Sequence, residues 1–207
     1  MLKRTKGRIL LTMLVITGLA GTVNNSTLSN QERKFAIAQL KDTRTDLLVS
    51  VKGLSETQVN FRPSADKWSI KECLYHISQT EKEVWDKLET AMKEPATPEK
   101  RSELQISDEQ VLKTVTDLSC KLILAETSQT NNAQLRSTSE ALSKFKSSRA
   151  EHVKYVKTTT GDLRNHFIQL SIGWVDCYQA IIFMAGQCDR HIQQINELLV
   201  DPRFPRK

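Results

Sequence analysis

Apolar side chains recur at helical spacing in four long segments of the chain. The segments are residues 28–54, 69–92, 140–158 and 177–200, and a shorter one covers residues 108–118. In each of them apolar residues return every three or four positions, as they do on the buried side of an amphipathic helix. We therefore predict an all-α protein, a four-helix bundle whose helices are joined by long connections.

Residues that cap helices stand where these segments begin. Ser29 with Glu32, and Ser69 with Glu72, have the spacing of a capping box, in which each partner satisfies a free backbone N–H of the other. Further caps are expected at Ser107, Ser137 and Asp176.

The connections between the helices are polar or rich in turn-forming residues. Residues 55–68, 94–100, 127–137 and 158–173 lack helical periodicity, and we expect loops there. No internal repeat and no alternating strand pattern is found, so we expect no sheet.

The first 20 residues have the composition of a secretory signal. Four basic residues between Lys3 and Arg8 precede an uncharged apolar run that reaches Ala20. The run is shorter than the roughly 20 apolar residues that a membrane-spanning helix needs. Gly18 and Ala20 are small, so we expect cleavage after Ala20 and export to the periplasm or beyond; an uncleaved anchor is the alternative. The predicted parts are then a signal peptide (1–20), a linker (21–28), the bundle (29–201) and a tail (202–207).

The signal segment changes how the net charge is interpreted. The whole chain has 30 basic and 24 acidic residues, a net charge of +6. Residues 1–20 hold four of the basic residues and no acidic ones, so the rest of the chain has 26 basic against 24 acidic residues, or +2. A nucleic-acid-binding protein needs a concentrated basic face. We therefore expect no nucleic-acid partner, and no membrane contact beyond the signal segment.

The histidines and cysteines are the residues best suited to chemistry. His76 and His191 share the inward side of their helices with Ile77 and Ile195. A hydrogen-bonded place in the core explains a single inward histidine, but two on different helices make a metal site a serious alternative. Four cysteines allow three complete pairings, among which the sequence does not choose. The cysteines are Cys73, Cys120, Cys177 and Cys188, and the other histidines are His152 and His166.

Two segments resemble the DinB/YfiT-like family. The stretch GLSETQVNFRPSADKWSIKECLYHISQTE (53–81) resembles that family's helix-loop-helix, in which a Trp-Ser-x-x-Glu stretch leads to a ligand histidine. LRNHF, followed by GWVDCYQAIIFMAGQCDRHIQQINEL (173–198), resembles its final segment. The resemblance covers most of residues 30–200. It implies a four-helix bundle with a divalent-metal site made by three histidines, one on the second helix and two spaced four apart on the last.

The resemblance assigns two of the three ligands directly. His76 and His191 match ligand positions, and Gln187 stands where the third histidine is expected. Residues 187 and 191 share one helix face, but an amide oxygen is a weaker ligand than imidazole for zinc-like ions. We predict a weakened site for zinc, nickel or manganese, with Cys188 as an alternative ligand. Cys73 and Cys188 each precede a site histidine by three residues, so they would approach each other if the two histidines meet. A disulfide between them is one expectation, and two buried free thiols are the other.

The remaining assignments concern catalysis and partners. His166 is the candidate proton-transfer residue. Arg149 and Arg190 are expected on exposed helix faces, and reaching into a pocket is the alternative. The first functional hypothesis is a metal-dependent enzyme, a thiol transferase or hydrolase acting on a small-molecule substrate or thiol. The second is a non-catalytic bundle with a degenerate site, serving as a ligand-binding or structural protein. Because the family often forms dimers through helix faces, a homodimer is a further expectation.

Overall fold

The computed structural model describes residues 27–65, 67–119 and 137–206. The predicted signal peptide, most of the linker, Cys120 and nearly all of the predicted loop at 127–137 lie outside these ranges. Among the described residues, no helix has the length and apolar character needed to span a membrane.

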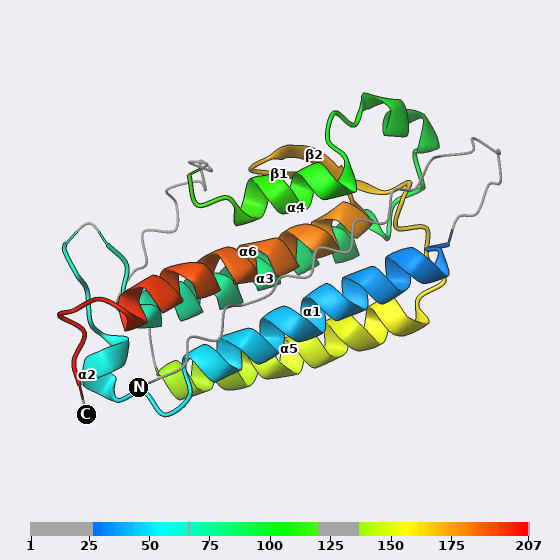
Figure 1. The fold of residues 1–207 in the computed structure, drawn as a ribbon. Coiled ribbons are helices and arrows are strands. Elements are labelled where there is room, and N and C mark those ends of the chain that lie inside the picture. Colours follow the sequence, from blue (N-terminus) through cyan, green and yellow to red (C-terminus); the bar gives the residue numbers. More distant parts are fainter. Residues whose placement is uncertain (1–26, 66, 120–136, 207) are drawn as a thin grey trace.

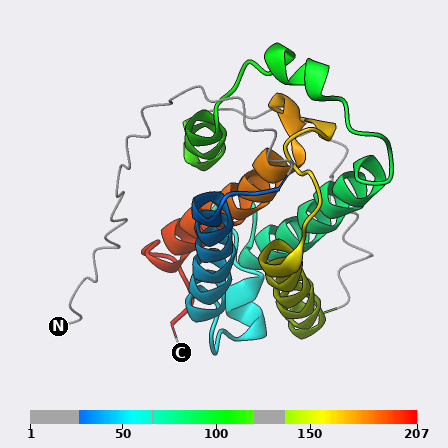
Figure 2. The same ribbon diagram turned by 90° about the vertical axis from the view of Figure 1, so that its right-hand side faces the viewer.

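Four long helices form the bundle, as predicted. They are α1 (Asn30–Ser50), α3 (Ile70–Ala91), α5 (Thr138–Thr158) and α6 (Cys177–Leu199). Helix α6 packs against α1 and α3, and α5 packs against the same two helices (Figures 1 and 2). Helices α1 and α3 therefore lie at diagonally opposite corners of the bundle, and α5 and α6 lie at the other two corners.

The helices begin where the sequence predicts, because the capping groups are in place. Ser29, Ser69 and Asp176 each accept a hydrogen bond from the backbone N–H three residues on, and the side chain at that position bonds back to the cap. Ser107 caps the short helix α4 (Asp108–Thr116) in the same way, and Ser137 caps α5.

Helix α4 lies along the outer side of α6 (Figure 1). The two helices approach closely at Gly186, where an added Cβ would stand 3.1 Å from Val115 Cγ1 and 3.4 Å from Leu112 Cδ1. A 3₁₀ helix, Pro98–Glu103, precedes α4 in the chain.

Three of the predicted loops contain regular structure, since the 3₁₀ helix begins inside residues 94–100, and the expectation of no sheet is wrong. Strands β1 (Phe167–Leu170) and β2 (Gly173–Asp176) form an antiparallel hairpin, with Ile168 opposite Val175. Both of these residues are buried. A two-stranded hairpin is marginally stable on its own, so this one depends on packing against the bundle. Its four-residue strands are also too short to show a clear alternation in the sequence. The loop predicted at residues 55–68 contains a one-turn helix, α2 (Glu56–Val59).

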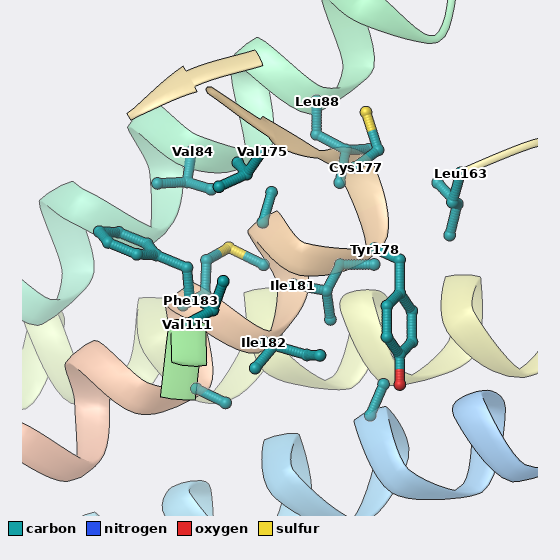
Figure 3. Close-up of a cluster of buried hydrophobic side chains, with 14 of the residues drawn as sticks. Val84, Leu88, Val111, Leu163, Val175, Cys177, Tyr178, Ile181, Ile182 and Phe183 are labelled. Atoms are coloured by element: carbon teal, nitrogen blue, oxygen red, sulfur yellow. The ribbon is translucent and has the colours of Figure 1, made fainter. Parts of the chain in front are cut away.

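The buried apolar residues form two clusters along α6. The hairpin-side core lies beneath the β-hairpin and includes Val84, Leu88, Ile181 and Phe183 (Figure 3). The tail-side core lies toward the C-terminal end of α6 and is represented by Leu47, Ile70, Ile195 and Leu198. Along α6 the boundary between the clusters falls between Ala185 and Cys188.

The segment after α6 packs back on the domain rather than extending from it. The Phe204 ring contacts Phe61 edge-on at a centroid distance of 5.4 Å, and the Gln58 amide donates a hydrogen bond to Pro205 O. Arg203 also donates to Pro63 O. These contacts fasten the loop that carries α2 over the end of the bundle.

Candidate metal centre

The imidazole rings of His76 and His191 meet between α3 and α6. Their centroids are 4.7 Å apart and their planes are inclined by 71°. Both residues are almost fully buried, with exposed fractions of 3% and 1%. The structure therefore brings together the two histidines that the sequence places on different helices.

Hydrogen bonds leave one ring nitrogen of each histidine without a protein partner. His191 Nδ1 lies 2.7 Å from Gln194 Oε1. Because a carbonyl oxygen only accepts, Nδ1 donates and Nε2 holds the free electron pair. His76 Nε2 lies 3.2 Å from Thr80 Oγ1. His76 Nδ1 and His191 Nε2 are buried and have no hydrogen-bond partner among the described residues.

Gln187 adds two more unsatisfied polar atoms, one helical turn from His191. It lies one turn before His191 on α6 and is 2% exposed. Neither its Oε1 nor its Nε2 has a hydrogen-bond partner in the described part of the chain. A buried polar atom without a partner costs about 1–3 kcal/mol, so four such atoms from three neighbouring side chains need an explanation.

A divalent metal ion fits this donor set, although the set is weaker than a three-histidine site. Burial lowers the pKa of His76 to about 4. Burial, with a smaller contribution from the neighbouring His76, lowers the pKa of His191 to about 3. Both rings are therefore neutral near pH 7, the state in which imidazole binds metals. No group of three or more His, Cys, Asp or Glu residues in the described ranges is placed to hold a metal, so a third ligand would come from another kind of side chain, such as the Gln187 amide.

Trp68 covers the two imidazoles, a contact that the sequence analysis missed. Its indole stacks on His191, with 5.7 Å between ring centroids and 13° between planes, and meets His76 at 4.9 Å and 60°. Trp68 precedes Ser69, the cap of α3, and is half-buried. The contact with His191 joins positions far apart in the chain, so helical periodicity does not predict it.

The two buried thiols are weaker candidates than Gln187 for the third ligand. Cys73 and Cys188 are both free and buried, and burial raises the pKa of each thiol to about 12. The Cys188 sulfur lies 3.8 Å from the carbonyl oxygen of Thr43, on α1. Since a cysteine binds a metal as the thiolate, these observations favour Gln187 over Cys188 as the third ligand.

His166 lies at the other end of the bundle, so the structure does not support its predicted catalytic role. Its Nδ1 is 2.6 Å from Asp162 O and its Nε2 is 3.0 Å from Glu94 O, so both ring nitrogens face backbone carbonyls. Its own carbonyl accepts from Cys177 N, at the start of α6. His191 is 14 residues farther along that helix, or about 21 Å at 1.5 Å per residue.

The expectation that Arg149 and Arg190 are exposed is also wrong. Their exposed fractions are 0% and 8%. Arg149 forms a buried ion pair with Glu81 on α3, and Arg190 donates to the carbonyl oxygen of Asp117. The partners are 68 and 73 residues away in sequence, which is why helical periodicity did not predict them.

Comparisons with known proteins agree with this fold. A family model described as the DinB superfamily matches residues 39–195. Among solved structures, YfiT from Bacillus subtilis superposes with a TM-score of 0.59, at 13% sequence identity, over 85% of this chain and 96% of YfiT. YfiT is described as "a probable metal-dependent hydrolase with an unusual four-helix bundle topology". A search of curated protein sequences finds no match. Because the family model covers most of the bundle, the chain belongs to the DinB superfamily.

Proposed function

We propose that this protein binds a divalent metal ion through His76 and His191, with Gln187 as a third and weaker ligand. The observation that carries the proposal is the contact between the buried His76 and His191 rings, each with a ring nitrogen that has no partner among the described residues, together with the unpartnered buried amide of Gln187 one turn away on α6. Zinc, nickel and manganese are the candidate ions, and imidazole favours the first two.

The proposed activity is metal-dependent hydrolysis or thiol transfer on a small molecule. A bound zinc-like ion lowers the pKa of coordinated water and so supplies a nucleophile at neutral pH. The description of YfiT as a probable metal-dependent hydrolase supports hydrolysis over thiol transfer. Gln194 holds the His191 ring in the tautomer that presents Nε2, and such outer hydrogen bonds orient metal ligands. The Trp68 indole keeps water from both rings, so a substrate has to displace it.

The enclosure of the site supports a second candidate, a non-catalytic bundle. His76, Gln187 and His191 are each at most 3% exposed, whereas a catalytic zinc site keeps one position open to water or substrate. In this candidate the three side chains form a closed ligand-binding or structural site.

Metal binding and hydrolysis by the full chain, purified without a metal-affinity tag, test the two candidates. Zinc, nickel and manganese chlorides are titrated by calorimetry into the parent protein and into the variants His76→Ala and His166→Gln. His166→Gln is the matched control, because it replaces a histidine outside the site. Hydrolysis of p-nitrophenyl acetate is then measured with and without the bound metal. We expect zinc binding, and metal-stimulated hydrolysis, in the parent and His166→Gln but not in His76→Ala.

The alternatives give different results. Binding without any metal-stimulated hydrolysis would favour the closed, non-catalytic site. If none of the three ions binds the parent, or if His76→Ala binds zinc as tightly as the parent, the proposed ligand set is wrong.

A further inference from the structure

A cavity of about 240 Å³ opens between α3 and α5, separate from the metal centre. Liquid water occupies about 30 Å³ per molecule, so the cavity has room for a ligand of roughly eight non-hydrogen atoms. Trp85 and Phe145 supply aromatic walls, and Ser78, Ser148 and His152 supply polar ones. None of the three metal-centre side chains lines it.

The floor of the cavity is held by a buried ion pair. Arg149 Nε lies 2.9 Å from the Glu81 carboxylate, and the two side chains are 0% and 3% exposed. The other guanidinium nitrogens donate to Thr43 Oγ1 at 3.4 Å and to Met184 O at 3.3 Å. Arg149 therefore joins α5 to the other three helices of the bundle, which fixes the position of Glu81.

Glu81 and Trp85 together fix the orientation of His152. His152 Nδ1 lies 2.9 Å from Glu81 Oε1. The two atoms are not aligned for a hydrogen bond, so the contact is one of proximity between the ring and the carboxylate. The imidazole stacks on the Trp85 indole, with 3.8 Å between centroids and 21° between planes. In the neutral ring with its proton on Nδ1, beside the Glu81 carboxylate, Nε2 holds the free electron pair and is the ring nitrogen left to accept from a ligand in the cavity.

The charges around the cavity favour a cation. Lys82 pairs with Asp86, and Arg149 neutralises Glu81. Among the remaining charged lining residues, the carboxylates of Glu89 and Glu151 outnumber the single ammonium group of Lys144. Glu89 also accepts a hydrogen bond from the Trp85 indole N–H at 2.8 Å, which places its carboxylate beside the aromatic wall.

We propose that this cavity binds a small organic amine with an apolar body. The ammonium group donates hydrogen bonds to His152 Nε2 and to the Ser148 hydroxyl, and Glu89 and Glu151 supply the counter-charge. The apolar body lies against Trp85 and Phe145, where burial of apolar area adds to the affinity. The proposal does not depend on metal binding at His76 and His191.

Nuclear magnetic resonance titration of the full chain tests the proposal, with benzylamine as the probe. Benzoate and benzyl alcohol are the matched anionic and neutral probes. The Trp85 indole N–H signal is identified by its loss in Trp85→Phe, and the His152 ring nitrogens are followed in a long-range ¹H–¹⁵N spectrum. We expect benzylamine to shift the Trp85 and His152 signals saturably, with a Kd of about 1 mM, and to leave the His166 signals unchanged. Benzoate should produce no saturable shift, and benzyl alcohol should bind more weakly than benzylamine.

Charge variants then separate a specific site from general attraction. The double variant Glu89→Gln/Glu151→Gln keeps the side-chain shape and an acceptor for the Trp85 indole, and it should weaken benzylamine binding at least fivefold. Glu83→Gln removes an exposed α3 charge that does not line the cavity and should leave the Kd unchanged. The proposal is overturned if benzylamine shows no saturation, if benzoate or benzyl alcohol binds as tightly, or if Glu83→Gln has the same effect as the double variant.

Discussion

Replacing Gln187 with histidine should convert the weak metal site into a strong one. Gln187 is 2% exposed and lies one turn from His191 on the same face of α6. An imidazole there completes an i, i+4 chelating pair that faces His76 on α3. The side chains are of similar size, and the amide atoms that are lost have no protein partners among the described residues, so the metal-free fold should change little in stability.

The expected gain follows from the energy of a single zinc ligand. Structural zinc sites bind the ion with about 10–16 kcal/mol through four ligands, which is about 2.5–4 kcal/mol for each if they share equally. Because 1.4 kcal/mol is a factor of ten in Kd and the amide already contributes part of this energy, Gln187→His should bind zinc about 100-fold more tightly. The Kd is measured at pH 7.5 by competition with a chromophoric chelator.

Three control variants show whether the gain comes from the site. Gln187→Ala should change the zinc affinity of the parent by less than tenfold. Gln187→His/His76→Ala should lose the gain, because the ligand on α3 is gone. Gln31→His adds an imidazole on an exposed part of α1 and should gain nothing. If Gln187→His binds zinc no better than the parent or Gln31→His, residues 76, 187 and 191 do not act on one ion.

Three further predictions concern stability and processing. Because burial lowers the pKa of His76 to about 4 and of His191 to about 3, the unfolded chain takes up protons below pH 6.5 that the folded chain does not. The free energy of unfolding of the metal-free protein should therefore fall by several kcal/mol in total between pH 7 and pH 4; urea midpoints measure it, and an equal fall in His76→Gln/His191→Gln would contradict the assignment. Arg149→Met should cost about 3–5 kcal/mol by leaving the Glu81 charge buried, and Arg149→Met/Glu81→Leu should recover part of it in chemical denaturation; no recovery would show that the cost is not one of unpaired charge. Protein expressed in a bacterial host should start near Gly21 by N-terminal sequencing, whereas cytoplasmic material that keeps Met1 would contradict export.

The helix ends could be predicted from the sequence because their causes are local. The Ser69–Glu72 and Asp176–Gln179 capping boxes each lie within four residues, and such spacing is readable without a structure. The hairpin was missed because its stability comes from the bundle beneath Ile168 and Val175. A pair of four-residue strands with a two-residue connection carries too little alternation to be recognised.

The candidate site was only partly predictable, for the same reason. The inward placement of His76 and His191 follows from helical periodicity, but their meeting on facing helices followed from a family resemblance. The stacking of Trp68 on His191 and the pairing of Arg149 with Glu81 join positions far apart in the chain. Gln194 is the exception, because its i, i+3 spacing from His191 made the hydrogen bond predictable.

The proposed function requires that His76 and His191, with Gln187, hold one metal ion. Crystals of the full chain soaked in zinc chloride, with diffraction recorded on both sides of the zinc absorption edge, test it most directly. The account predicts an anomalous peak between α3 and α6, about 2.0–2.1 Å from a ring nitrogen of each histidine. Zinc bound only elsewhere on the protein, with both imidazoles still against Trp68 and no peak between them, would contradict it.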